Sequence, residues 1–383
     1  MSDKKVHFES ALKNNLIKKF DYTKFKNITR IANGGFGTVY RAKSLILRKL
    51  VALKCLHKDD ESFFEKFVKE LTNIVALNCH DNIIKFYGIS IDPSTETYYL
   101  VLQYAKDGDL KTYLQNNFNT LDWKIKIQMA KDITSGLYCI HGENIVHRDL
   151  HSKNILVHEG SLLITDLGLS QSLDTNSNSI IGGTFAYSDP EYLRNQMKSI
   201  SYKRNKASDI YSLGVLFWEL SSGRPPFNKF THLGICKMVT SGEREKPINE
   251  TPKDYINIYS SAWNDDPKQR PTIESIFDSL GNIKLENIYN DPNDNQEAYS
   301  NDQSQASMDA FSKDSVSMDF SKDSLSFSSL TTSNLGEVTE VSQVSIKNIK
   351  DHVSDLTLTD LENLEITGKS SIHENNLCIS NIS

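Results

Sequence analysis

The chain has 383 residues, of which 38% are hydrophobic, and its formal net charge at pH 7 is -6. This length and apolar content allow at least one large buried core and suggest about two structural units. No run of roughly 18 apolar residues is present and no apolar segment follows Met1, so we expect neither a membrane span nor a secretory leader. Lys and Arg are spread along the chain instead of forming one basic stripe, which argues against a nucleic-acid partner.

The cysteines indicate the compartment. Five are scattered without the spacing of a metal site, and their odd number predicts reduced thiols, with neither disulfides nor zinc. We therefore expect a soluble protein of the cytoplasm, with the nucleus as an open alternative. The oligomeric state stays unknown from the sequence.

Composition changes sharply near Asn282. Beyond it Ser, Asp and Asn dominate, and from Asp291 to Ser383 there are 16 Asp and Glu against 5 Lys. We expect residues 282–383 to form a disordered acidic tail. Within residues 353–366, four apolar side chains could share one helical face and dock on a partner, although a transient solvated helix is the favoured interpretation: Val353, Leu358, Leu361 and Leu364.

The first part of the chain has the pattern of a small sheet with one helix. Residues 28–43 and 50–56 resemble short strands, with a glycine-rich turn inside the first. Residues 62–77 carry apolar side chains at helical spacing, and strands are expected again near residues 83–89 and 98–104.

A largely helical part follows. Asp122 can cap a helix in which apolar residues recur at helical intervals from Trp123 to Ile140. Residues 210–220 are apolar almost all round, as in a helix at the centre of a domain. A sheet followed by helices predicts a two-lobed α+β fold.

The glycine-rich turn lies between Ile31 and Tyr40. Glycines let backbone amides approach phosphates, and Val39 can cover a purine ring. Alone, an ordinary β-turn is the commoner explanation of such a hairpin.

Lys54 is predicted to lie on an apolar strand, where an unpaired ammonium is costly, so a phosphate and a carboxylate are expected as its partners. Glu70, on the next helix, can be that carboxylate. If the pair stood alone, a lysine that reaches solvent and a solvated glutamate would be the plainer alternatives.

Two further segments give the pattern its specificity. Residues 147–154 read HRDLHSKN, and Asp166, Leu167 and Gly168 follow behind another apolar run. They resemble the catalytic loop and the metal-binding triplet of eukaryotic protein kinases, and residues 28–280 resemble that family in motif order and spacing. The resemblance implies a bilobal protein kinase fold and transfer of the γ-phosphoryl group of ATP to protein hydroxyls, with ATP and Mg²⁺ as ligands.

The resemblance also implies residue roles. Asp149 would accept the proton of the substrate hydroxyl, while Asn154 and Asp166 would hold Mg²⁺. Lys153 could supply a further cation beside the phosphates. With Lys54, the remaining nucleotide contacts would come from the glycine-rich turn, the hinge between the lobes and the walls around the adenine: Ile31, Ala32, Asn33, Gly34, Gly35, Phe36, Gly37, Val39, Ala52, Leu102, Gln103, Tyr104, Ala105 and Leu156.

Other kinase-like marks concern the fold. Glu191, near the end of an activation segment, is expected to pair with Arg270, and Asp209 is expected to accept hydrogen bonds from the backbone of the catalytic loop. We place the kinase domain at residues 28–281, after an N-terminal extension of residues 1–27.

The acceptor hydroxyl is less well specified. Thr184 resembles the threonine that braces the catalytic aspartate in serine/threonine kinases. His151 stands where those kinases usually have lysine, and Lys153 stands where receptor-type tyrosine kinases often have arginine. Such mixtures are typical of the tyrosine-kinase-like group, so we expect Ser/Thr hydroxyls and leave Tyr open. Residues 147–157 also resemble kinase families expanded in soil (mycorrhizal) fungi.

Four positions depart from the family pattern: Ala32, His151, Leu167 and Asp189. None removes a predicted catalytic group, so we expect catalysis. The alternative is a pseudokinase, an adaptor or scaffold that binds nucleotide without catalysis.

Regulation is predicted from Arg148, which in this family commonly receives a phosphate from the activation segment. Hydroxyls are available there for an upstream kinase, at Ser170, Ser172, Thr175, Ser177 and Ser179.

Overall fold

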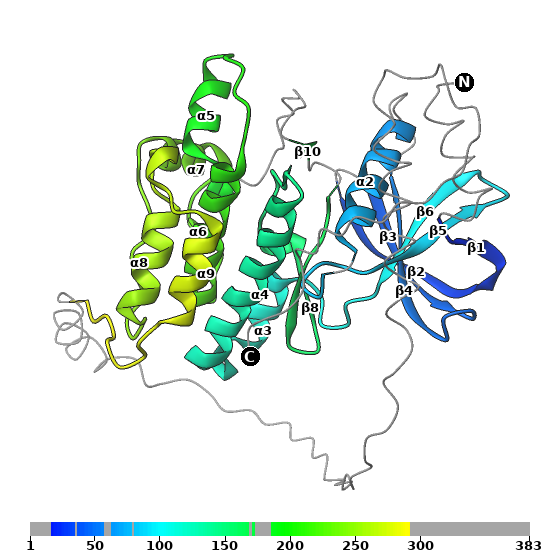
Figure 1. Cartoon of the computed structure of the whole chain (residues 1–383), viewed down its shortest axis with the longest axis horizontal. Coiled ribbons are helices and arrows are strands. Elements are labelled where there is room, and N and C mark those ends of the chain that lie inside the picture. The colour runs from blue at the N-terminus through cyan, green and yellow to red at the C-terminus, as the bar shows by residue number, and fades with distance from the viewer. Residues whose placement is uncertain are drawn as a thin grey trace, which may run out of the picture.

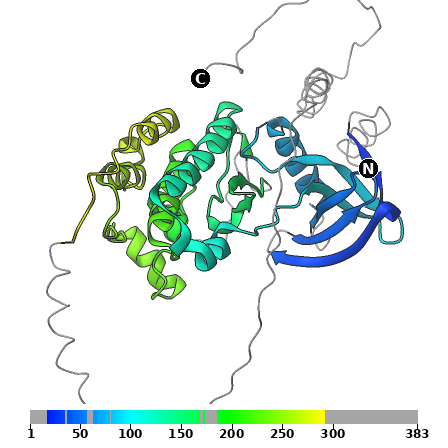
Figure 2. The same ribbon diagram turned by 90° about the horizontal axis from the view of Figure 1, so that it is seen from below.

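The computed structural model describes residues 17–34, 37–56, 63–78, 80–167, 171–172 and 185–291. They form a smaller lobe around a sheet and a larger lobe of helices (Figure 1). The helix α4 (Trp123–Gly142) and the strand β8 (Ile155–His158) lie between the sheet and the helices that follow β8 in the chain, as Figure 2 shows from below. The predicted two-lobed α+β fold is thereby confirmed. Among the described residues, no helix has the length and apolar character needed to cross a bilayer.

Within the described residues, the smaller lobe has one six-stranded sheet of order β1-β5-β6-β4-β3-β2. Its strands are β1 (Lys19–Asp21), β2 (Phe25–Gly34), β3 (Gly37–Ser44), β4 (Lys49–Leu56), β5 (Phe86–Asp92) and β6 (Thr97–Gln103). β1 runs parallel to β5, with Lys19 opposite Ile89, and the other neighbours are antiparallel. Gly88 permits this edge, because its φ is +147° and a Cβ there would lie 2.2 Å from the backbone oxygen of Lys18.

Alternation along β4 sends its side chains into two different cores. Val51 and Leu53 belong to an apolar cluster on one face of the sheet. Ala52 belongs to the large cluster on the other face, which continues into the helical lobe and includes Phe67 of α2 (Phe63–Leu77). Lys54, two residues on, lies on this second face and is 7% exposed. The sheet thus places a lysine on the face toward the other lobe.

The larger lobe is organised around α6 (Lys206–Ser222), in which an unbroken run from Ser208 to Ser221 is buried. The other helices are α3 (Leu110–Asn117), α5 (Pro190–Met197), α7 (His232–Thr240), α8 (Lys253–Ala262) and α9 (Ile273–Gly281). Gly214 lets α8 approach α6 closely, since a Cβ there would lie 2.8 Å from the backbone nitrogen of Trp263. Short strands β7 (Ile145–Val146), β9 (Ser161–Ile164) and β10 (Gln171–Ser172) complete the lobe.

Two expected boundaries in the smaller lobe are wrong. The sheet begins at Lys19, inside the stretch assigned to an N-terminal extension. A strand of three residues that pairs with a distant strand leaves no periodic pattern in the sequence. The strand expected near residues 83–89 begins at Phe86, and Ile83 forms only an isolated bridge to Ile164.

The expected start of the disordered tail is also too early. The backbone N–H of Tyr289 donates to the Thr251 oxygen at 2.8 Å, and Glu250 donates to the Tyr289 oxygen at 2.8 Å. Residues up to Asp291 are therefore joined to the helical lobe by backbone pairing. The possible tail helix at residues 353–366 lies outside the described residues.

Candidate active site

Lys54 on β4 joins two acidic residues from different parts of the chain. Its Nζ lies 2.6 Å from Glu70 Oε1 on α2 and 2.9 Å from Asp166 Oδ1, which follows β9. Glu70 is 2% exposed. Burial disfavours the charged form of Lys54, but the nearby Asp166 and Glu70 outweigh it, so the pKa of Lys54 is raised. The lysine is thus held as a cation between residues of the two lobes.

The loop before β8 brings Asp149 and Asn154 together. Asn154 Nδ2 donates to the backbone oxygen of Asp149 at 2.8 Å and to its Oδ2 at 3.1 Å. His151 Nε2 lies 3.5 Å from the same Oδ2, while its Nδ1 accepts a hydrogen bond from the Lys153 N–H. These neighbours hold the Oδ2 atom and thereby fix the direction of the Asp149 carboxylate.

Asp209, on α6, anchors this loop through its backbone. Its carboxylate accepts the backbone N–H groups of His147 and Arg148, each at 2.8 Å, and lies 2.9 Å from His141 Nε2. Burial opposes ionisation, but His141 and the backbone donors outweigh it and lower the pKa of Asp209. His147 Nε2 lies 3.1 Å from the Thr165 oxygen, which ties the loop to the segment that carries Asp166.

Apolar side chains from both lobes meet beside these polar groups. Ala52 on β4 and Leu102 on β6 are buried in the large core cluster, and they are opposite each other in the sheet. Val39 on β3 and Leu156 on β8 are partly buried against the same cluster. The four residues thus come from both lobes and share one apolar cluster.

The predicted hinge follows β6, and the glycine-rich turn lies between β2 and β3. Gln103 ends β6 and donates its backbone N–H to Lys85, after which Tyr104 and the buried Ala105 continue toward the helical lobe. At the turn, Thr38 Oγ1 donates to Asn33 Oδ1 at 2.9 Å across the hairpin. The predicted nucleotide residues lie on its two strands, apart from Gly35 and Phe36, which lie outside the described residues: Ile31, Ala32, Asn33 and Gly34 on β2, and Gly37 and Val39 on β3.

A comparison with family models supplies the deciding observation. The model described as "protein tyrosine and serine/threonine kinase" matches residues 25–280. The chain belongs to the protein kinase family. The matched residues include β2 to β6, the helices from α2 to α9, and all the polar groups described above.

Three curated relatives illustrate the range of this kinase family. Mitogen-activated protein kinase kinase kinase 10 of Xenopus laevis is 32% identical over 278 residues, which cover 68% of this chain and 26% of the relative. Serine/threonine-protein kinase dst2 of Dictyostelium discoideum is 30% identical, with coverage of 66% and 22%. Serine/threonine-protein kinase PrkC of Bacillus subtilis (strain 168) is 32% identical, with coverage of 66% and 39%. The chain thus spans less than half the length of these relatives. Its resemblance to kinase families of soil fungi stays a prediction.

The acid–arginine pair of this kinase-family chain is not the expected one. Arg270 Nη1 lies 3.0 Å from Asp189 Oδ2, and Nη2 lies 3.1 Å from Asp189 Oδ1. The predicted pair between Glu191 and Arg270 is therefore wrong. Asp189 is the N-cap of α5, from which its side chain reaches inward, whereas Glu191 lies partly exposed in the first turn, with Tyr202 Oη 3.5 Å from its carboxylate.

One buried glutamate, close to the loop that carries Asp149, was not predicted from the sequence. Glu219 on α6 accepts a hydrogen bond from Tyr187 Oη at 2.6 Å, and the same hydroxyl lies 3.2 Å from Ser152 Oγ in the loop. Burial raises the pKa of Glu219 to about 7, although the hydrogen bonds of Tyr187 and Ser152 oppose the shift. The available signal was a single acidic residue inside the apolar run of residues 210–220.

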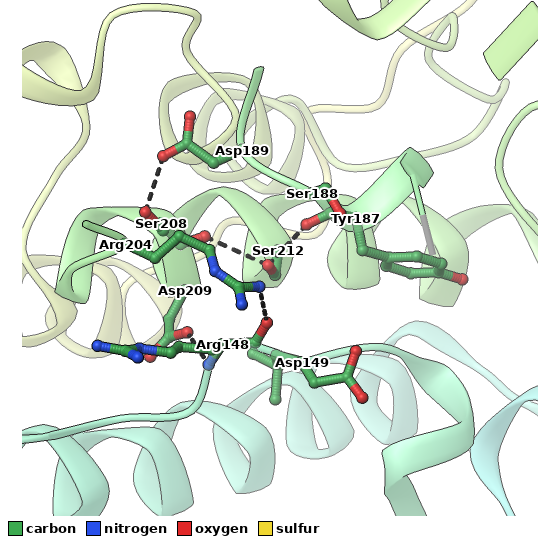
Figure 3. Close-up of a pocket in the computed structure, with 10 residues that line it drawn as sticks. Arg148, Asp149, Tyr187, Ser188, Asp189, Arg204, Ser208, Asp209 and Ser212 are labelled. Carbon is green, nitrogen blue, oxygen red and sulfur yellow. Dashed lines mark hydrogen bonds between the residues drawn. The ribbon is translucent and has the colours of Figure 1, made fainter. Parts of the chain in front are cut away.

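The region between the catalytic loop and α6 also contains a cavity of about 10 Å³, enough for one water molecule (Figure 3). Among the predicted regulatory residues, Arg148 lines it and is 7% exposed. Ser172 lies in β10, and the side chain of Lys153 is exposed. The other predicted regulatory hydroxyls lie outside the described residues: Ser170, Thr175, Ser177, Ser179 and Thr184.

Proposed function

We propose that the chain is an ATP- and Mg²⁺-dependent protein kinase that phosphorylates serine or threonine hydroxyls, with tyrosine as an open second acceptor. The observation that carries the proposal is the position of Lys54 between Glu70 and Asp166. Lys54 is a buried cation held by the Glu70 carboxylate on α2 and the Asp166 carboxylate after β9. We assign it to the phosphates of a nucleotide whose adenine would lie beside Ala52, Leu102, Val39 and Leu156.

In the proposed reaction the substrate hydroxyl oxygen forms a bond to the γ-phosphorus of ATP. The bond from that phosphorus to the bridging β–γ oxygen breaks, and ADP leaves. Asp149 Oδ1 receives the hydroxyl proton, while Asn154 holds Oδ2 and so fixes the direction of the carboxylate. The energetic contribution of these residues is mainly orientation and electrostatic stabilisation.

Asn154 and Asp166 fit the requirements of Mg²⁺. Magnesium prefers hard oxygen ligands, and a carboxylate and an amide oxygen are such ligands. Because the amide nitrogen of Asn154 donates to Asp149, its oxygen is the atom left for a cation. When bound, the ion would neutralise charge on the phosphates. We assign this role to the two residues together.

The preference for serine and threonine rests on the relatives, since dst2 and PrkC are both described as serine/threonine-protein kinases. We also propose regulation through Arg148 by phosphorylation of the activation segment, and action in the cytoplasm. The residues predicted to contact ATP are part of the same proposal.

The purified full chain incubated with Mg²⁺ and γ-labelled ATP tests the proposal. We expect it to label itself or a generic protein substrate, and Asp149→Asn to abolish labelling with an unchanged melting temperature. Phosphoamino-acid analysis of the product distinguishes serine and threonine from tyrosine. Absence of labelling by the wild-type chain, together with a nucleotide-induced rise in melting temperature, would instead support the pseudokinase alternative.

A further inference from the structure

The peptide unit that joins Arg148 to Asp149 is held at both of its polar atoms. Its carbonyl oxygen accepts a hydrogen bond from Arg204 Nη1 at 2.5 Å, and its N–H donates to His147 Nδ1 at 3.3 Å. Figure 3 shows the Arg204 guanidinium directed at this carbonyl, with Asp149 extending away from it. We propose that Arg204 is a positioning residue that fixes this peptide and thereby the direction of the Asp149 carboxylate.

The backbone at this point needs such support. Arg148 has a φ of +69°, in the left-handed region that residues with a side chain rarely adopt. Asp209 holds the preceding peptide through the Arg148 N–H at 2.8 Å. Arg204 holds the carbonyl of the following peptide from the segment that precedes α6. Without Arg204 the peptide between Arg148 and Asp149 could rotate while the Asp209 anchor stayed in place.

Arg204 is itself fixed by a second contact. Its guanidinium carbon lies 4.4 Å from the ring centroid of Tyr192 on α5, a cation–π contact. The side chain is half-buried, which limits the solvent competition for both contacts. Arg204 therefore connects the catalytic loop to α5, the helix that begins at the end of the predicted activation segment.

Arg204 also lies close to a second positive charge, the Arg148 guanidinium. Burial, to which the nearby Arg204 adds, lowers the pKa of Arg148 to about 10. Two guanidinium groups are thus close enough to repel each other. The bond from Arg204 to the Arg148 carbonyl and the stacking on Tyr192 offset that repulsion. A lysine would reproduce these contacts only in part, and an alanine not at all.

This inference rests on the proposed kinase activity for its catalytic consequence, but its structural consequence can be measured separately. In the full chain, Arg204→Ala is expected to lower kcat about 10-fold with little change in the KM for ATP, since a hydrogen bond to a charged donor is lost at the loop and not at the nucleotide. The kcat of Arg204→Lys should lie between those of the wild type and Arg204→Ala. Guanidinium ion at about 20 mM, which is below denaturing concentrations, should restore part of the activity of Arg204→Ala.

A matched control is Arg224→Ala, because Arg224 also stacks its guanidinium on an aromatic ring, 5.5 Å from the Trp218 centroid. Arg224 is not among the residues proposed for the active site, so the kcat of Arg224→Ala should stay at the wild-type value. Lys203→Ala, at the exposed neighbour of Arg204, should also leave kcat unchanged.

Amide hydrogen exchange over residues 146–152 gives a readout that needs no activity. We expect exchange about 10-fold faster there in Arg204→Ala and unchanged in Arg224→Ala. Wild-type inactivity with faster exchange in Arg204→Ala would refute the proposed function and keep the positioning role. Unchanged exchange, or a loss of activity that matches a loss of folded protein, would refute the positioning role.

Discussion

Arg270 and Asp189 form a two-pronged ion pair in which both side chains are fully buried, 0% exposed each. Asp189 also accepts a hydrogen bond from Ser208 at 2.8 Å, so the end of the activation segment is joined to α6 as well as to the loop before α9. The pair therefore anchors the residues just before α5 to the helical lobe.

Removing one member of this pair should destabilise the protein strongly. Asp189→Ala leaves the Arg270 guanidinium buried without its counter-charge, and we expect a loss of about 3 to 5 kcal/mol in the free energy of unfolding. Glu191→Gln, the matched control, should change it by less than about 0.5 kcal/mol, because Glu191 is partly exposed. Urea unfolding followed by tryptophan fluorescence measures both, and a larger effect of Glu191→Gln would contradict the assignment.

The pair between Lys54 and Glu70 should separate stability from activity. Lys54→Met leaves a buried carboxylate unpaired, so we expect a loss of about 3 kcal/mol in stability and at least a 100-fold loss of kcat. In the double variant Lys54→Met, Glu70→Leu, two apolar side chains replace the pair, which should recover most of the stability. Its activity should stay lost. Recovery of activity in the double variant would mean that Lys54 has no part in the chemistry.

Glu219 predicts a pH dependence of stability. Its pKa in the folded protein is about 7 against an ordinary value of 4.5, so between these values the folded state holds a proton that the unfolded chain releases. Stability should therefore fall as the pH rises from about 4.5 to about 7, by up to about 3 kcal/mol, and stay level above that range. The hydrogen bonds of Tyr187 and Ser152, and to a smaller extent the nearby Lys111, limit the size of the effect.

The comparison variant for this effect is Glu219→Gln, which cannot ionise. Unfolding free energies of both proteins at several pH values between 5 and 8 should converge at the acidic end and diverge toward neutrality, with the wild type less stable there. Parallel curves would exclude Glu219 as the titrating group.

Gly88 gives a test of the parallel edge strand. A methyl group in Gly88→Ala would meet the Lys18 backbone oxygen, at a φ that disfavours side chains, so we expect about 2 kcal/mol or more of destabilisation. Gly142→Ala should be nearly neutral, because no atom lies within 4 Å of the added Cβ. Thermal unfolding of both variants measures the difference, and equal melting temperatures would show that β1 contributes little.

Much of the site could be predicted because its residues are fixed by local patterns. The alternation that buries Val51 and Leu53 on one face necessarily turns Lys54 toward the other lobe. Likewise, Asp149 and Asn154 are five residues apart in one loop, so they meet through their own backbone geometry. The strand pattern was enough to single out Lys54, whereas Asp149 and Asn154 were named through the resemblance of their loop to the protein kinase family.

The remaining features depend on contacts between distant segments, which a sequence pattern does not encode. Asp189 and Glu191 are two residues apart, and only the direction in which the N-cap of α5 points decides that Asp189 meets Arg270. Arg204 lies in a polar stretch with no periodicity, and its target is a backbone oxygen, which has no sequence signature. Strand β1 likewise depends on a partner far along the chain.

The residues proposed to surround the adenine ring belong to, or pack against, the apolar cluster that joins the two lobes. Ala52 and Leu102 of that cluster come from the sheet, and Leu156, packed against it, comes from the helical lobe. A bound purine ring would then act as a removable part of the hydrophobic core. Nucleotide binding should accordingly stabilise both lobes together, so that their unfolding transitions rise in temperature as one.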